Sequence, residues 1–87
     1  MAVLTGTVTA ATSAVILYRN NSYKNQNVTF TTHGNSGDVY VGPSNVTASS
    51  NGVVFAKSLT YTVWVPAGET LYCAGNGTDT VKWVAFA

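Results

Sequence analysis

Charged side chains are scarce in this sequence of 87 residues. They make up 8% of it, against about 25% in ordinary globular domains. The cations Arg19, Lys24, Lys57 and Lys82 are scattered along the chain. Because phosphate backbones are bound by clustered cations, nucleic acid is not an expected partner. Hydrophobic residues still make up 46% of the chain, so the low charge does not predict disorder.

Residues that carry most enzyme and metal chemistry are also few. Cysteine and histidine each occur once, as Cys73 and His33, and the carboxylates are Asp38, Glu69 and Asp79. One cysteine excludes a disulfide within the chain, and one histidine without a nearby cysteine argues against zinc. We expect Cys73 to be a small buried hydrophobe, His33 to bond nearby backbone at a strand end, and Glu69 and Asp79 to lie in solvated turns. The sequence predicts no catalytic residue, no metal and no cofactor.

Long apolar runs are absent. The longest, Ala14 to Tyr18, is far below the ~20 residues of a spanning helix, so no membrane association is expected. The first residues lack the basic and apolar regions of a signal peptide, which predicts synthesis in the cytosol if Met1 is the true start. Glycosylation sequons begin at four asparagines, and we interpret them as chance in a chain rich in Asn and Thr. They are Asn20, Asn27, Asn45 and Asn76.

The length predicts a single domain over residues 1–87, with residues 1–12 as either an N-terminal arm or an edge strand. A domain this small buries only about 60–65% of the surface of its unfolded chain. Small scaffolds gain stability from disulfides, metals or oligomerisation, and the first two are not expected here. We therefore expect oligomerisation to supply the additional stability.

Val and Thr dominate the chain, and apolar residues recur with a period of two, which favours β-strands. The pattern predicts an all-β fold, a small antiparallel β-sandwich or barrel of seven or eight short strands. Asn51-Gly52 is a strong signal for a type I′ hairpin turn. The candidate strand segments are nine, the first of which is the possible arm: Val3–Thr9, Ala14–Arg19, Asn27–His33, Asp38–Gly42, Val46–Ser49, Val53–Lys57, Leu59–Val65, Glu69–Ala74 and Thr80–Phe86.

Several of these strands carry large apolar residues on both faces. In Thr80–Phe86, Trp83 shares a face with Val81 and Ala85, while Val84 and Phe86 lie opposite. A small sandwich has one core, so leftover apolar residues predict a second buried surface. We expect Trp64, Tyr72, Trp83, Val84 and Phe86 to form an interface. A curved barrel whose loops cover these residues is the alternative.

A second interpretation of the aromatic residues is recognition. Tyr18, Tyr40 and Trp64 would then stack on a sugar, in a β-sandwich that binds carbohydrate. Strand aromatics more often belong to a core or an interface, so this remains the alternative.

Three segments resemble small β-rich virion proteins of tailed bacteriophages. They are Asp38–Thr47, the Asn51-Gly52 turn, and Val65–Ala74 with its Pro-Ala-Gly-Glu turn and Leu-Tyr strand. The resemblance implies a structural virion component made in the host cytoplasm. Its most favoured form is a capsid decoration (cement) protein that self-associates, as a trimer, and binds the major capsid protein. The alternative is a carbohydrate- or receptor-binding module of a tail or fibre.

Overall fold

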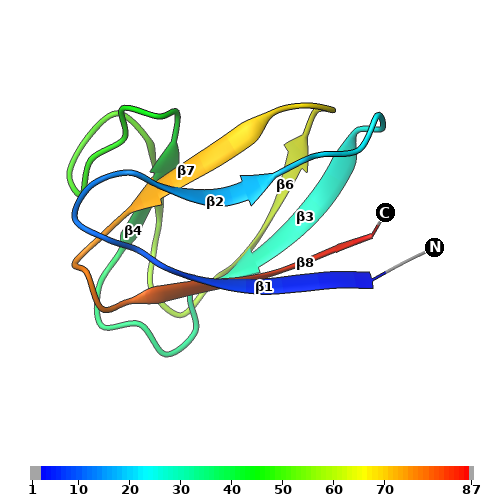
Figure 1. The fold of residues 1–87 in the computed structure, drawn as a ribbon. Coiled ribbons are helices and arrows are strands. Elements are labelled where there is room, and N and C mark those ends of the chain that lie inside the picture. Colours follow the sequence, from blue (N-terminus) through cyan, green and yellow to red (C-terminus); the bar gives the residue numbers. More distant parts are fainter. Residues whose placement is uncertain (1–2, 87) are drawn as a thin grey trace.

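The computed structural model describes residues 3–86 as eight β-strands, with no helix among them (Figure 1). This confirms the predicted all-β class. The described part therefore has no helix that is long and apolar enough to cross a membrane. The strands are β1 (Val3–Thr9), β2 (Val15–Arg19), β3 (Gln26–Thr31), β4 (Val39–Gly42), β5 (Val53–Phe55), β6 (Thr60–Val65), β7 (Thr70–Ala74) and β8 (Thr80–Phe86).

The strands form two antiparallel sheets of four that face each other (Figure 1). The β1 sheet has the order β1-β8-β3-β6, and the β2 sheet has the order β2-β7-β4-β5. Strand 1 pairs with 8, 2 with 7, 3 with 6 and 4 with 5. This nested pairing is the jelly-roll arrangement, a double-sheet sandwich. Each sheet keeps two free edges, so the fold is a sandwich and not a closed barrel.

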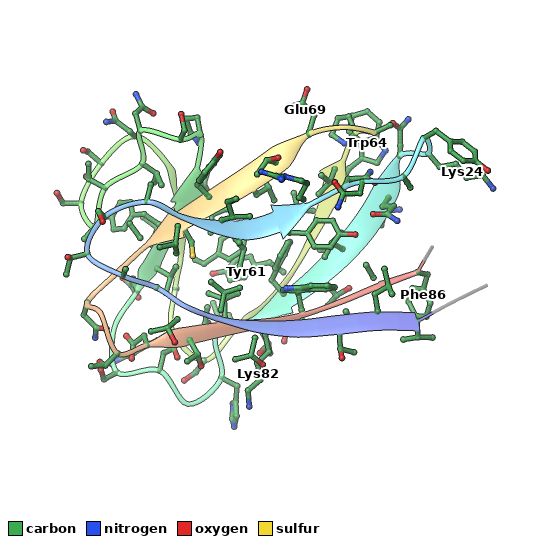
Figure 2. All side chains as sticks on the ribbon, in the orientation of Figure 1. Lys24, Tyr61, Trp64, Glu69, Lys82 and Phe86 are labelled. Atoms are coloured by element: carbon green, nitrogen blue, oxygen red, sulfur yellow. The ribbon has the colours of Figure 1, made fainter. Side chains whose placement is uncertain are left out.

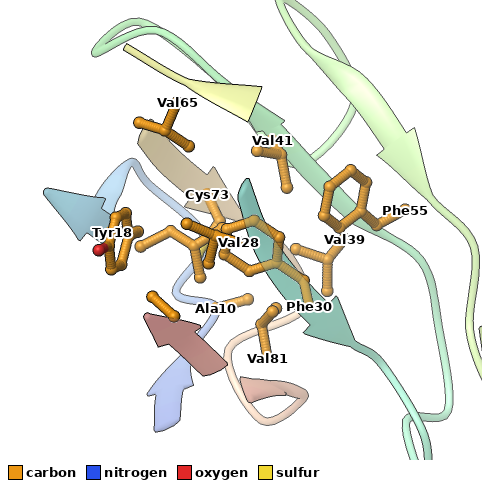
Figure 3. Packing of buried hydrophobic residues seen from close by; sticks show 12 residues of the cluster. Ala10, Tyr18, Val28, Phe30, Val39, Val41, Phe55, Val65, Cys73 and Val81 are labelled. Carbon is orange, nitrogen blue, oxygen red and sulfur yellow. The ribbon is translucent and has the colours of Figure 1, made fainter. Parts of the chain in front are cut away.

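The core lies between the two sheets and is built from alternate residues of each strand (Figure 3). Phe30 at its centre is fully buried, and its ring lies 5.8 Å from that of Phe55. Phe55 in turn stacks on Tyr61 at 4.3 Å, which joins β5 of one sheet to β6 of the other. An aromatic pair stabilises a fold by about 0.5–1.5 kcal/mol beyond the contribution of the area it buries. The contacts of Phe30, Phe55 and Tyr61 therefore help to hold the two sheets together.

One expected strand is wrong. Val46–Ser49 belongs to the loop between β4 and β5, where Thr47 makes only an isolated bridge to Ser13. The Asn51-Gly52 hairpin is wrong as well, because β5 pairs with β4 across the whole loop. Asn51 has φ of 65°, but Gly52 is not in the left-handed region that a type I′ turn requires at both residues.

Candidate interaction surfaces

The outer face of the β1 sheet is covered with threonine. The register places outward-facing residues of all four strands in cross-strand rows, because side chains alternate between the two faces of a strand. One row is Thr5, Val84, Thr29 and Thr62, and the next is Thr7, Lys82, Thr31 and Thr60. Lys82 is the one charged residue in these two rows. The face is thus polar but almost without charge.

One end of this face carries exposed apolar residues, with the polar Asn27 of β3 opposite Trp64. Val3 pairs with Phe86 across β1 and β8, and Trp64 lies at the same end on β6 (Figure 2). Val3 is 61% exposed, Trp64 60% and Phe86 53%. With Val84 in the neighbouring row, these four residues are called the apolar end here. Three of the five residues expected at an interface, namely Trp64, Val84 and Phe86, therefore lie on one face of one sheet.

Tyr72, the fourth expected interface residue, lies on the opposite side of the molecule. It belongs to the outer face of the β2 sheet, where the register sets it beside Ile16 and Gly42. The neighbouring row contains Ala74, Tyr40 and Val54. Ile16 and Val54 are 44% and 41% exposed. Each sheet therefore has its own apolar outer patch.

Trp83, the fifth expected residue, faces inward. It packs against the core, and its ring contacts that of Tyr18 edge-on at 4.7 Å. The same ring lies against Gly6 of β1, where an added Cβ would be 2.5 Å away from it. Trp83 therefore does not lie on an outer face with Val84 and Phe86, because period-two alternation places residues 83 and 86 on opposite faces of β8.

The three residues of the proposed sugar platform do not meet. Tyr18 is 5% exposed, and its hydroxyl donates a hydrogen bond to Oε1 of Gln26. Burial raises the pKa of Tyr18 above 10.0. Tyr40 lies on the outer face of the β2 sheet, and Trp64 lies on the outer face of the β1 sheet. A single ligand cannot stack on all three, so this arrangement is wrong.

A groove runs between the free edges of β1 and β2. Its volume is about 610 Å³, and its walls are mainly apolar. Arg19, Asn21 and Gln26 add polar groups to its lining. Nothing in the sequence indicated this groove, because its existence depends on which strands become edges. The apolar lining includes Leu4, Gly6, Val8, Ile16, Tyr18 and Trp83.

Asp79 was expected to lie in a solvated turn. Instead its carboxylate accepts hydrogen bonds that join two loops. Its Oδ1 accepts hydrogen bonds from the backbone N–H and hydroxyl of Ser36, at 3.0 and 3.2 Å. Its Oδ2 accepts from the Gly37 N–H and from Asn76 Nδ2, both at 2.9 Å. The backbone hydrogen bond from Ser36 lowers the pKa of this carboxyl most, with further lowering by Gly37 and the two side chains, against a rise from desolvation. Only 6% of Asp79 is exposed.

The remaining candidate residues are dispersed. His33 is exposed just after β3, and Glu69 is exposed before β7. Cys73 is fully buried in the core, and desolvation raises its pKa to about 11. Within residues 3–86, no three His, Cys, Asp or Glu side chains are grouped closely enough to hold a metal ion.

No family model matches the chain, and no curated protein matches it. Among solved structures, its fold is similar to that of a protein from Bacillus endospore appendages, which are described as a novel family of disulfide-linked pili. The TM-score is 0.63, with 18% identity over 99% of this chain and 85% of that chain. At this identity the likeness establishes the sandwich fold alone.

Proposed function

We propose that this chain is a structural subunit whose copies associate with one another on the surface of a larger particle. The observation that carries the proposal is the apolar end of the β1 sheet. Its exposed residues lie on a face that carries little charge, and residues of this kind mark surfaces that are buried by association. The proposal assigns no chemical reaction to the chain.

The particle we favour is a bacteriophage virion, with the chain as a capsid decoration protein. This rests on the sequence resemblance of Asp38–Thr47 and Val65–Ala74 to small virion proteins. The similar fold of a pilus protein supports only the broader idea of a repeating assembly. A jelly roll is also a common fold of viral coat domains.

Disulfide linkage of the kind named for the pilus does not suit these residues. A chain of subunits joined by disulfides needs two accessible cysteines in each subunit. Here Cys73 is alone and fully buried. Association is therefore proposed to be non-covalent and to depend little on salt, because few charges are available to be screened.

Light scattering of the purified protein tests this proposal. We expect an average mass above that of one chain, unchanged between low and high NaCl, with a trimer as the favoured species. The double variant Trp64→Ser, Phe86→Ser should bind less to phage shells that lack the protein. Val53→Ser is the matched control, because Val53 is an exposed apolar residue (69%) on β5 of the other sheet. A monomer at every concentration that also fails to bind shells would refute the proposal.

Sugar recognition is the second candidate function, and the groove between β1 and β2 favours it. The Trp83 and Tyr18 rings lie beside polar groups of Arg19, Asn21 and Gln26, a combination that suits a sugar ring. Binding would quench tryptophan fluorescence on titration with capsule or cell-wall glycans. Trp83→Leu should abolish this quenching, whereas Trp64→Ser should leave it intact.

A further inference from the structure

The β1 sheet ends in two long free edges. β1 has seven residues and β6 has six, and each pairs on one side only. Neither strand contains a charged residue or proline, and the register of each with its neighbour is continuous. Charges, prolines, bulges and short length are the features that stop an edge strand from pairing with another chain. Both edges of this sheet lack all of them.

The β2 sheet differs, because both of its edges are blocked. β2 carries a register shift between Ile16 and Tyr18 and ends in the cation Arg19. β5, at the other edge, is only three residues long. The same molecule thus protects the edges of one sheet and leaves those of the other open. This contrast indicates that the β1 sheet is the one that adds strands.

Strand direction shows what can be added. β1 is antiparallel to β8, β8 to β3, and β3 to β6. β1 and β6 of one copy therefore run in opposite directions. A second copy in the same orientation, set beside the first, offers β6 antiparallel to β1, which is the direction that continues the sheet.

The side chains at the two edges also match. The outer face of β1 has Thr5 and Thr7, and that of β6 has Thr62 and Thr60 in the same two rows. Threonines directly opposite each other on antiparallel strands stabilise the pair. Such a pair already exists within the sheet, where the hydroxyls of Thr29 and Thr62 lie 3.2 Å apart.

We infer that β1 of one copy pairs with β6 of the next copy, so that the β1 sheets of neighbouring subunits form one continuous sheet. The inference rests on the proposed association of copies and names its contact. The pairing joins different surfaces, so it repeats around a closed ring or along an open fibre. The neighbour would also cover the mouth of the groove beside β1, where Leu4 and Ile16 are now exposed.

Engineered cysteines test this pairing. Within one copy, Thr5 and Thr62 are separated by three strand spacings, roughly 14 Å, which is too far for a disulfide. We expect Thr5→Cys and Thr62→Cys proteins, mixed and mildly oxidised, to give a covalent dimer that contains one copy of each. The double variant should give a ladder of covalent oligomers on a non-reducing gel. Thr7→Cys with Thr60→Cys repeats the test in the next row.

Thr29→Cys on the central strand β3 is the control, because its side chain meets another copy only when two sheets pack face to face. If Thr29→Cys cross-links and the two edge pairs of cysteines do not, the edge pairing is wrong. The copies would still associate, but through the faces of their sheets. Wild-type protein that is monomeric by light scattering, together with double variants that give no ladder, would overturn association itself.

Discussion

The indole ring of Trp83 lies directly against Gly6 of the neighbouring strand, where a Cβ would come within 2.5 Å of the ring. The two residues are paired in the register of β1 and β8. Gly6 is the one residue of β1 without a side chain, and the large ring of Trp83 occupies the space above it. The pairing fixes the edge strand β1 on the sheet and makes one wall of the groove.

Gly6→Ala should therefore destabilise the protein, because the added methyl group displaces the Trp83 ring. Overpacking of this kind costs about 1–3 kcal/mol of unfolding free energy. Urea denaturation followed by tryptophan fluorescence measures the change. In a Trp83→Leu background the same substitution should cost much less, since a smaller side chain leaves room for the methyl group. Equal costs in the two backgrounds would show that the ring is not the obstacle.

The stability of the loops around Asp79 should depend on pH. The folded-state pKa of this carboxyl is lowered below 3.8, chiefly by the hydrogen bond from the Ser36 backbone. A lowered pKa means that ionised Asp79 stabilises the fold above its unfolded pKa. This contribution is lost as pH falls through the folded value. Urea midpoints should therefore drop at acid pH, below about 4.

Asp79→Asn should lower the urea midpoint at pH 7, because Nδ2 of an amide cannot accept a hydrogen bond. It should also reduce the drop of the midpoint at acid pH, because the carboxylate that titrates is gone. Asp38→Asn is the control, since Asp38 is exposed and accepts a single hydrogen bond, from the Lys57 backbone N–H. If the Asp79→Asn protein loses as much stability at acid pH as the wild type, Asp79 is not the group responsible for the pH dependence.

The sequence predicted the faces of the strands better than their partners. Period-two alternation correctly set Val81 and Ala85 against Val84 and Phe86, because alternation is a local property of a strand. It failed for Val46–Ser49, since a strand requires a partner and the neighbouring chain at Thr47 offers only one bridge. The other strand ends lie within two residues of those predicted.

Candidate sites were harder to predict because they depend on contacts between distant residues. From the sequence alone, Asp79 is predicted to be a solvated turn residue. Its partners Ser36 and Gly37 lie more than forty residues earlier, and only the fold brings their loop beside it. The groove likewise exists only because β1 and β2 are both edges. Trp64 and Phe86 could be predicted as exposed from alternation alone, but their presence at one end of one face required the register.

Asn20 should be more important for folding than as a glycosylation site. It is fully buried, and its Nδ2 donates to the carbonyl oxygens of Lys24 and Val65, both at 2.9 Å. Asn20→Ala leaves these carbonyls without their donor and should cost about 2 kcal/mol of unfolding free energy. Asn21→Ala, at an exposed position next to it, should change stability by less than about 0.5 kcal/mol. Similar losses for the two variants would argue against this role.

Cys73 should be unreactive in the folded protein. Its thiol is fully buried, and desolvation raises its pKa to about 11, so almost no thiolate is present near neutral pH. We expect a thiol reagent such as dithionitrobenzoate to react with wild-type protein only after urea is added. The rate in native buffer should follow the rare opening of the fold.

The Thr5→Cys variant provides the reference, because residue 5 is exposed on the outer face of β1 and its thiol should react at once. Native wild-type protein should also remain free of intermolecular disulfides in air, in contrast to a disulfide-linked fibre. Rapid labelling of Cys73 would mean that the region around β7 opens readily. Covalent assembly through this thiol would then compete with the non-covalent edge pairing proposed for β1 and β6.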